Sequence, residues 1–419
     1  MRSTDDTRRS PARRGAGRPP RSSYDGSVPV PRADDVTVVG GGVVGLSIAW
    51  QAATTGRSVA VVDGDPGRGS SWAAAGMLAP AGEAHFGEDP LARLNVAAAA
   101  RWPAFARDLE EASDSSVGYR ADGTLLVAVD HADRQAVDDL LRYQLELGLD
   151  ASRLTASECR HLEPLLTPGV SGGAEFRHDH QVDNRAVVRA LLDACRAAGV
   201  VFVSDRVRGI VTRRGRIERV DLEGGGFRAT VAVVLAAGAW SGTIAGVPSP
   251  SVPPVRPVRG LTLRLRAEGT TGTLARTVRG AVHGRHCYLV PRNDGSLVVG
   301  ATSEEKGFDL SVPVGATAVL LADARELFPA LDEYALVELA TGLRPGSPDN
   351  APIVGRASPE GLVVATGHYR NGFLLAPVTA DAVVALLDGA PDVEAFRPFT
   401  PERFGPERAG PTPAEAGAR

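Results

Sequence analysis

The stretch VTVVGGGVVGLSIAW, residues 36–50, decides the fold of this 419-residue chain. Its first four residues are a short β-branched run, which is typical of a buried strand. Gly40, Gly42 and Gly45 then follow in the pattern G-x-G-x-x-G. Apolar residues after them repeat at helical spacing, and Gly56 marks the end of the helix. The stretch therefore predicts a buried strand, a glycine turn and a helix in immediate succession.

A second strand, predicted over residues 58–62, ends at Asp63. Glycines let the backbone approach a pyrophosphate, and the N-terminus of the following helix offers free amides and partial positive charge. An acidic residue about 20 residues after the glycines can accept hydrogen bonds from a ribose hydroxyl. This context predicts a dinucleotide-binding unit rather than a structural turn, but the glycine pattern does not distinguish FAD from a nicotinamide cofactor.

The composition is that of an ordinary soluble globular protein, with 43% hydrophobic residues, 23% charged residues and a net charge of −4. This charge gives no indication of nucleic acid binding. The length corresponds to about three domains, or to one large α/β unit with a second domain inserted into it. Lys306 is the only lysine, which argues against a lysine Schiff base and against a P-loop.

The cysteines and histidines do not predict a metal site. Three cysteines lie far apart without metal or redox spacing, so we expect a reducing, cytoplasmic location. Two histidine pairs, His178 with His180 and His283 with His286, have no matching cysteines or carboxylates, and we interpret them as surface or core residues. The cysteines are Cys159, Cys195 and Cys287.

The two ends of the chain differ in composition from the rest. Residues 1–34 are rich in arginine, proline, serine and glycine, which predicts a disordered tail, and residues 397–419 are predicted to be loose. Arginine pairs at 8–9 and 13–14 could instead belong to a twin-arginine export signal. That alternative has less support, because the apolar stretch after them has a better use in the nucleotide-binding unit. No segment reaches the roughly 18 uninterrupted apolar residues of a membrane span, so no membrane association is expected.

In two further stretches, the residue types predict that another group approaches the backbone closely. GSSWAAAGMLAP, residues 69–80, combines small side chains with glycine and proline, so a regular helix is not expected there. One reason for such small side chains is that another molecule lies against them. TVAVVLAAGAW, residues 230–240, is a continuous apolar run typical of a strand buried on both faces, and Gly238 near its end predicts a second close approach.

The remaining patterns predict two more helices, one before and one after a series of short strands. A helix capped by Asp183 or Asn184 has an apolar face and ends at Gly199. The proline-dense residues 248–257 mark a crossing into another domain, where alternating segments predict antiparallel strands with a hairpin turn at 292–295. The other predicted strands are 200–203, 207–212, 217–222, 260–265, 286–290, 296–300 and 362–365, and a long helix follows the last of them.

Six stretches together resemble the FAD-dependent amine oxidases of the D-amino acid oxidase family, and more narrowly the glycine oxidases of thiamine biosynthesis. The resemblance covers nearly the whole chain without its two ends. The first stretch is shared by many flavoproteins, whereas the last two are fairly specific to the glycine oxidase branch. The stretches are VTVVGGGVVGLSIAW, SSWAAAGMLAP, QVDNRAVVRAL, CYLVPRNDGSLVVGAT, TGLRPGSPDNAPIVGR and GHYRNGFLLAPVTA.

The resemblance implies an α/β fold of the two-domain α+β kind. It would consist of a Rossmann-like FAD-binding domain and an interleaved antiparallel-sheet substrate domain. The FAD-binding domain is expected at residues 35–115, 179–250 and 337–396, and the substrate domain at residues 116–178 and 251–336.

FAD is implied as a noncovalent cofactor, because relatives that attach flavin through cysteine carry it in the C-terminal flavin segment, where this chain has none. Residues 69–80 would wrap the flavin ring with Gly76 and Met77 against it, although Met77 could also be core filler. The helix that begins after Arg370 would offer amides to negative charge on the flavin. The implied FAD-binding residues are Gly40, Gly42, Gly45, Asp63, Ser71, Gly76, Met77, Gly238, Arg370, Asn371, Gly372 and Phe373.

Three residues match the substrate site of the family. Arg344 in TGLRPG matches a carboxylate-binding arginine, whose planar fork binds both oxygens. Tyr288 in CYLVPR matches a tyrosine that faces the same carboxylate, with a core role as the alternative, and Arg370 in HYRNGF matches an arginine near the flavin. Ser303 follows Gly-Ala-Thr where some members have methionine, which implies a roomier site than strict glycine preference needs.

The implied reaction is oxidative deamination of glycine and other small amines or D-amino acids. Hydride would pass from the α-carbon of a free-base amine to the flavin, and O2 would take the electrons to give H2O2. The imine would hydrolyse or pass to a thiazole synthase. Alternatives are a D-amino acid dehydrogenase or sarcosine-oxidase-like flavoenzyme with another electron acceptor, a nicotinamide-dependent enzyme and a noncatalytic FAD-binding protein. The chain is also compatible with a homo-oligomer.

Overall fold

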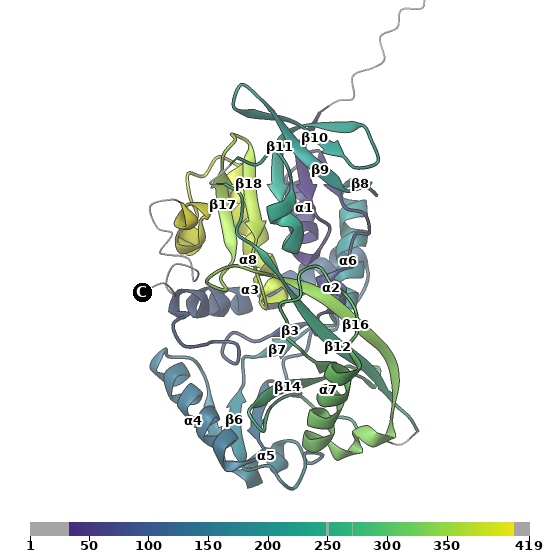
Figure 1. The fold of residues 1–419 in the computed structure, drawn as a ribbon, viewed down its shortest axis with the longest axis vertical. Helices are drawn as coiled ribbons and strands as arrows, with labels where there is room; N and C mark the ends of the chain where they lie inside the picture. Colours follow the sequence, from purple (N-terminus) through teal and green to yellow (C-terminus); the bar gives the residue numbers. More distant parts are fainter. Residues whose placement is uncertain (1–32, 249–250, 270, 406–419) are drawn as a thin grey trace, which may run out of the picture. The chain divides into compact units, whose positions relative to one another are not determined.

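The computed structural model describes residues 33–248, 251–269 and 271–405 of the chain. Two eight-stranded sheets organise these residues, together with a two-stranded pair (Figure 1). This mixed α/β arrangement agrees with the fold class predicted from the sequence.

The glycine stretch lies at the centre of the first sheet. β1 (Asp34–Val39) pairs in parallel with β2 (Val59–Val62) on one side and with β11 (Phe227–Leu235) on the other, and α1 (Val43–Thr54) follows β1. The strand order is β17-β18-β11-β1-β2-β8, and β9 and β10 are attached through β11. The predicted strand, turn, helix and strand are thus confirmed. The other strands are β8 (Val201–Val203), β9 (Val207–Arg213), β10 (Arg216–Leu222), β17 (Ile353–Ala357) and β18 (Leu362–Thr366).

Four helices share one hydrophobic core with the first sheet: α1, α3 (Asp89–Ser113), α6 (Asn184–Ala197) and α8 (Gly372–Leu387). The side chain of Asp183 caps α6 by accepting from the backbone N of Arg185 at 2.8 Å and of Ala186 at 3.1 Å, which confirms the predicted cap. Trp102 of α3 is fully buried, and its Nε1 donates to the carbonyl of Leu374 in α8 at 3.0 Å.

The second sheet has the order β16-β12-β15-β14-β13-β4-β6-β5, and its pairs are antiparallel except for β13 with β4. One core lies between this sheet and helices α5 and α7, and a separate cluster includes α4. The strands are β4 (Thr124–Ala128), β5 (Ser152–Leu154), β6 (Gly172–Phe176), β12 (Arg256–Ala267), β13 (Thr277–Val282), β14 (Arg285–Pro291), β15 (Ser296–Gly300) and β16 (Tyr334–Gly346). The helices are α4 (His131–Glu146), α5 (Ala156–Leu162) and α7 (Val314–Leu327).

The small-residue stretch 69–80 is one short helix followed by extended backbone, as expected. Its helix α2 (Ser70–Ala73) has four residues, and β3 (Met77–Leu78) then pairs with β7 (His180–Gln181). The short 3-10 helices of the described residues are η1 (Gly238–Thr243), η2 (Pro329–Glu333), η3 (Glu394–Phe399) and η4 (Pro401–Phe404).

The domain limits stay a prediction, but three of them fall within helices or strands that the structure describes. The limit between residues 336 and 337 falls inside β16, which pairs with β12 from one end to the other. The expected loose end begins at 397, whereas η3 and η4 extend to residue 404 and Phe399 is buried beside Phe396. The expected tail 1–34 lies outside the described residues except for its last two, and Asp34 already belongs to β1.

Candidate active site

The glycine turn is built from backbone contacts that exclude side chains. A methyl group on Gly45 would overlap the carbonyl oxygen of Gly40, so α1 can follow β1 this closely only with glycine there. Gly42 caps α1 without a side-chain bond, and Ser71 Oγ accepts from the backbone N of Val43 at 2.9 Å. The turn thus brings the N-terminus of α1 against the stretch 69–80.

Asp63 lies at the end of β2, where the sequence predicts it, and it already holds the turn. Its Oδ2 accepts from the backbone N of Gly41 at 2.7 Å, and its Oδ1 accepts from the backbone N of Asp65 at 2.8 Å. A carboxylate oxygen has two lone pairs, so these bonds leave acceptor capacity for a ribose hydroxyl.

A cavity of about 1140 Å³ begins at this turn and reaches the second sheet. The cavity wall does not include Gly40, Gly45 or Asp63. The predicted residues that line the cavity are Gly42, Ser71, Gly76, Met77, Gly238, Tyr288, Arg344, Arg370, Asn371, Gly372 and Phe373. The structure therefore brings together residues that are up to 331 positions apart in the chain (Gly42 to Phe373: 373 − 42).

The wall of small residues fits a flat ring with a pyrophosphate at one end. Ala73, Ala74 and Ala75 line it beside Gly42, and the N-termini of α1 and α8 both reach it. FAD would therefore be held by the α1 turn at its pyrophosphate and by residues 73–77 and the start of α8 at its flavin.

The absence of a side chain at Gly76 has another cause than the one expected from the sequence. Gly76 has φ +73°, and a methyl group there would overlap the carbonyl oxygen of Val182. Its own carbonyl accepts from the backbone N of Val182 at 2.9 Å. The protein's own backbone is thus sufficient to require glycine at this position, and the contact of Gly76 with a flavin ring stays a prediction.

Arg344 and Tyr288 lie on neighbouring parts of the second sheet, and glycines make room for both. Arg344 Nη1 donates to the carbonyl of Thr302 at 3.0 Å, and the guanidinium occupies the place where Gly260 would carry a side chain. The Tyr288 ring lies in the same way over Gly300, its partner on β15. Burial raises the pKa of Tyr288, although the charge of Arg344 acts in the opposite direction. The phenol therefore stays a neutral hydrogen-bond donor beside the guanidinium.

Arg370 reaches the cavity from the loop before α8, and other side chains hold it. Its Nη1 donates to His85 Nε2 at 2.9 Å and lies 3.9 Å from Glu83 Oε2. Burial lowers the pKa of His85, although Glu83 raises it, and this direction agrees with a neutral ring that accepts the bond. Arg370 is thus held by Glu83 and His85, whereas Arg344 lines the cavity with the carbonyl of Thr302 and the hydroxyl of Tyr288 as its neighbours.

The sequence interpretation missed a charged group in this wall. Glu83 and His85 come from the loop between β3 and α3, and Arg279 comes from β13, where it is the register partner of Tyr288. Arg279 Nη2 lies 2.9 Å from Glu83 Oε1. Burial raises the pKa of Glu83, but Arg279, Arg370, His85 and Arg344 outweigh it and the net shift is downward. Glu83 is therefore ionised.

His286 and Ser303 also line the cavity. His286, which we interpreted as a surface or core histidine, has a pKa lowered by burial and by Arg279 and Arg370. Arg279 belongs to no motif of the sequence, and the β13–β14 register alone places it opposite Tyr288. Glu83 and His85 belong to no motif.

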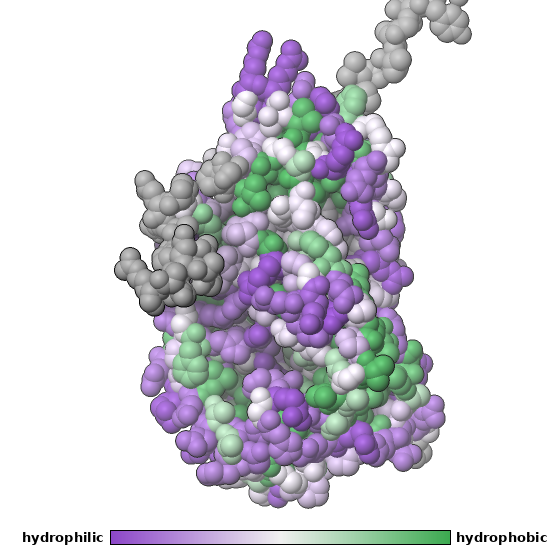
Figure 2. All heavy atoms as spheres, viewed as in Figure 1, coloured by the Kyte–Doolittle hydropathy of each residue, from purple (hydrophilic) through white to green (hydrophobic). Residues whose placement is uncertain are grey.

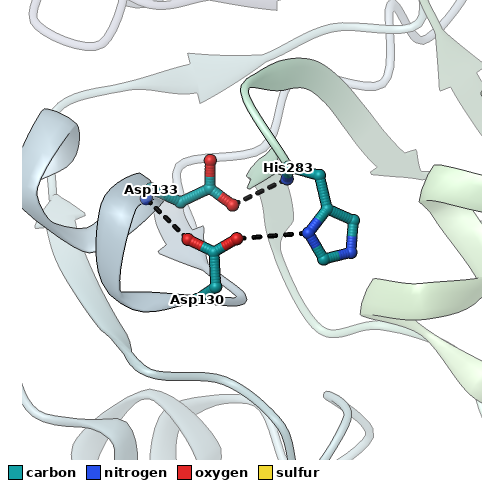
Figure 3. Close-up of side chains that lie close together, drawn as sticks. All are labelled: Asp130, Asp133 and His283. Atoms are coloured by element: carbon teal, nitrogen blue, oxygen red, sulfur yellow. Dashed lines mark hydrogen bonds and ion pairs between the residues drawn. The ribbon is translucent and has the colours of Figure 1, made fainter.

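A second cluster, of Asp130, Asp133 and His283, offers ligand atoms within 4.8 Å of one another (Figure 3). Asp133 accepts from the backbone N of His283 at 2.7 Å and of Gly284 at 2.8 Å. Asp130 Oδ2 lies 3.1 Å from His283 Nδ1, and Glu326 Oε1 lies 2.9 Å from His283 Nε2. These bonds form a clamp that ties the β13–β14 turn to α4 and α7.

Comparison with known proteins identifies the family. Residues 35–386 match the FAD-dependent oxidoreductase family known as DAO. The chain belongs to this family. It is 33% identical to the bifunctional protein ThiO/ThiG of Synechocystis over 88% of this chain, and 33% identical to the glycine oxidase of Geobacillus kaustophilus over 87% of this chain and 96% of that one. A crystal structure of the G. kaustophilus enzyme superposes with a TM-score of 0.80 at 30% identity, over 88% of this chain and 98% of that chain.

These matches confirm the predicted family, the fold class, FAD as the cofactor and the assignment to the oxidoreductases. The chain spans about half the length of the ThiO/ThiG proteins that it matches, covering 51 to 54% of them. Among the helices of the described residues, none combines the length and the apolar character needed to cross a membrane.

Proposed function

We propose that this member of the family oxidises glycine and other small amines or D-amino acids. The observation that carries the proposal is the convergence of Arg344 and Tyr288 on the cavity that the α1 turn also lines. A carboxylate there can meet a planar guanidinium and a neutral phenol together. The similarity to proteins named glycine oxidase supports the same substrate class.

FAD would supply the acceptor for the hydride from the α-carbon, and O2 would reoxidise it to give H2O2. The residues of the chain would bind and orient the substrate. Arg344 and Tyr288 would fix the carboxylate, and Ser303 would leave space beside the α-carbon for a substituent. Glu83 is held ionised by three arginines, so it is a weak base, and the amine would enter already deprotonated.

A screen of glycine, N-methylglycine, D-alanine and D-proline tests this proposal, with oxygen uptake and peroxide both measured. Equal amounts of peroxide and oxygen are expected with glycine. Reduction of the flavin by glycine without oxygen uptake would instead favour a dehydrogenase with another electron acceptor. No reduction of the flavin by any of these amines would refute the amino-acid assignment.

We also propose that the imine product is handed to a thiazole synthase. The support is the similarity to proteins in which a ThiO part and a ThiG part share one chain. Thiazole formation from glycine in a mixture of this protein with a thiazole synthase, its sulfur donor and its carbon co-substrate, at limiting glycine, would test the transfer. A cytoplasmic location, expected from the cysteines, stays a prediction.

We further propose a homo-oligomer that uses β16. This strand is at one edge of the second sheet, and an unpaired edge can pair with another chain. Its Leu336, Val337 and Leu339 are exposed, and so are Phe308 and Val314 on either side of Leu310, whose carbonyl accepts from Thr341 Oγ1 of β16 at 2.7 Å. Figure 2 shows hydrophobic residues gathered over the region of α7 and β16. Light scattering after size exclusion would show a monomer if the proposal is wrong.

A further inference from the structure

The loop between β3 and α3 carries Glu83 into the cavity, and a support outside the cavity holds it there. Both oxygens of Asp179 accept from this loop: Oδ1 from the backbone N of Ala81 at 2.9 Å and Oδ2 from the backbone N of Gly82 at 2.7 Å. Gln144 Nε2 donates to the carbonyl of Ala81 at 2.9 Å. The loop is thus fixed by its backbone directly before Glu83.

Asp179 does not line the cavity, and its side chain is fully buried between β6 and β7. A methyl group on Gly82 would lie 2.5 Å from Asp179 Oδ2 and 2.9 Å from Arg279 Nη1, so the loop is pressed against both groups. Arg279 Nη1 also donates to the carbonyl of Gly82. The same guanidinium therefore binds the loop backbone and, through Nη2, the Glu83 carboxylate.

The carboxylate of Glu83 in turn lies close to three charged or polar side chains. Its Oε1 lies 2.9 Å from Arg279, and its Oε2 lies 3.9 Å from Arg370 and 4.0 Å from His85. Arg370 and His85 are themselves bonded at 2.9 Å. Three groups from different parts of the chain therefore meet at one carboxylate.

We infer that Asp179 is a positioning residue of the active site, which acts by holding Glu83 between Arg279 and Arg370. Glu83 in turn keeps these two arginines away from the substrate carboxylate, so that Arg344 alone binds it in the productive orientation. The inference rests on the proposed function, since it assumes a carboxylate at Arg344.

The electrostatics of Asp179 agree with this role. Burial raises its pKa to about 7, against the lowering effect of the two backbone bonds and Arg279. A carboxylate whose pKa is raised on folding makes its largest contribution to stability below its unfolded pKa, and loses it as the pH rises through the folded value. Ionisation of Asp179 thus costs folding free energy as the pH rises through about 7, which suits a group kept for geometry rather than stability.

The test compares holoenzymes with Asp179→Asn, Glu83→Gln and both changes. Each single change should lower kcat for glycine at least about tenfold, and the double variant should lose no more than about twofold beyond Glu83→Gln, because the two residues act in series. The Kd of acetate, read from the flavin absorbance without turnover, should not rise, since freed arginines bind carboxylate in unproductive orientations. Additive losses, or an acetate Kd that rises with the fall in kcat, would overturn the inference.

Asp133→Asn is the matched control. Asp133 is also buried and also accepts two backbone N–H bonds, at 2.7 and 2.8 Å, but it holds the β13–β14 turn and does not line the cavity. Its kcat and acetate Kd should stay within about twofold of the wild type, and an equal loss of kcat would show a general effect of loosening. If Asp179→Asn does not fold, Gly82→Ala separates the loop from the support with every side chain retained, and the same results are expected.

A crystal structure of the Asp179→Asn holoenzyme tests this inference separately from the proposed function. Glu83 should have left its contact with Arg279, whether or not glycine is a substrate. Glu83 still 2.9 Å from Arg279 would overturn the positioning role. A wild-type enzyme that neither oxidises glycine nor binds acetate would refute the proposed function instead.

Discussion

Arg344 gives the sharpest test of how the substrate is held. Its guanidinium lies over Gly260 beside Tyr288, donates to the carbonyl of Thr302 and lines the cavity. Each charge-assisted bond contributes about 1.5–3 kcal/mol, which corresponds to a factor of about 10 to 150. Arg344→Lys keeps the charge but loses one bond of the fork, so kcat/KM for glycine should fall by about that factor. Arg344→Ala loses both bonds, and the fall should reach about 100-fold or more.

The assay is peroxide formation from glycine, compared with any amine without a carboxylate that the wild type turns over, such as ethylamine. The FAD content should stay near that of the wild type, because Arg344 is assigned to the substrate. Arg185→Lys is the matched control, since Arg185 also makes a two-bond pair, at 2.8 Å to each oxygen of Glu338, but lies outside the cavity wall. Equal losses on glycine and on the amine, or a loss of FAD, would show that Arg344 supports the flavin or the fold.

Four further results are expected. Gly45→Ala should lower both the FAD content and the melting temperature, because the methyl group overlaps the carbonyl of Gly40; an unchanged melting temperature would contradict this. Asp63→Ala should weaken FAD binding by about 1–3 kcal/mol, measured by titrating the apoprotein, and an unchanged Kd would remove Asp63 from the site. Acid precipitation should leave the flavin in solution, whereas a yellow pellet would show a covalent link. Hydrogen bonds to Asp130 and Glu326 raise the pKa of His283. The melting temperature of the wild type should therefore exceed that of His283→Gln by its full margin below about pH 6.5, and the margin should disappear as the pH rises through the raised pKa. A margin that grows with pH would contradict the clamp.

The part of the fold that local chemistry determines could be predicted from the sequence. The glycine turn, the Asp183 cap of α6 and the turn at 292–295 each depend on residues a few positions apart. α3 was not predicted, because Pro103 lies inside it and its Ala-rich sequence shows no cap; its partner Leu374 is 272 positions from Trp102. Long helices of this kind are specified by tertiary packing more than by local signals.

The charged wall of the site could not be predicted for the same reason. Glu83 meets Arg279 from 196 positions away (279 − 83), and neither has a neighbour in the sequence that marks it. Only the resemblance to a family placed Arg344 and Tyr288 in the site, since each would otherwise be one polar residue on a strand. Gly76 shows another limit, because the sequence predicts a ligand contact there but does not reveal that the carbonyl of Val182 also requires glycine.

The register of the second sheet explains why Arg344 and Tyr288 can act together. Tyr288 is directly opposite Gly300, and Arg344 is opposite Val258, which places Gly260 diagonally beside it. Both large side chains can therefore lie flat on the sheet, and both face the cavity. A shift of either pair by one residue would turn one side chain to the core on the other face, where Leu261 and Leu289 are fully buried. The proposed carboxylate site is thus a property of how four strands are paired, and the two glycines are as necessary to it as the arginine and the tyrosine.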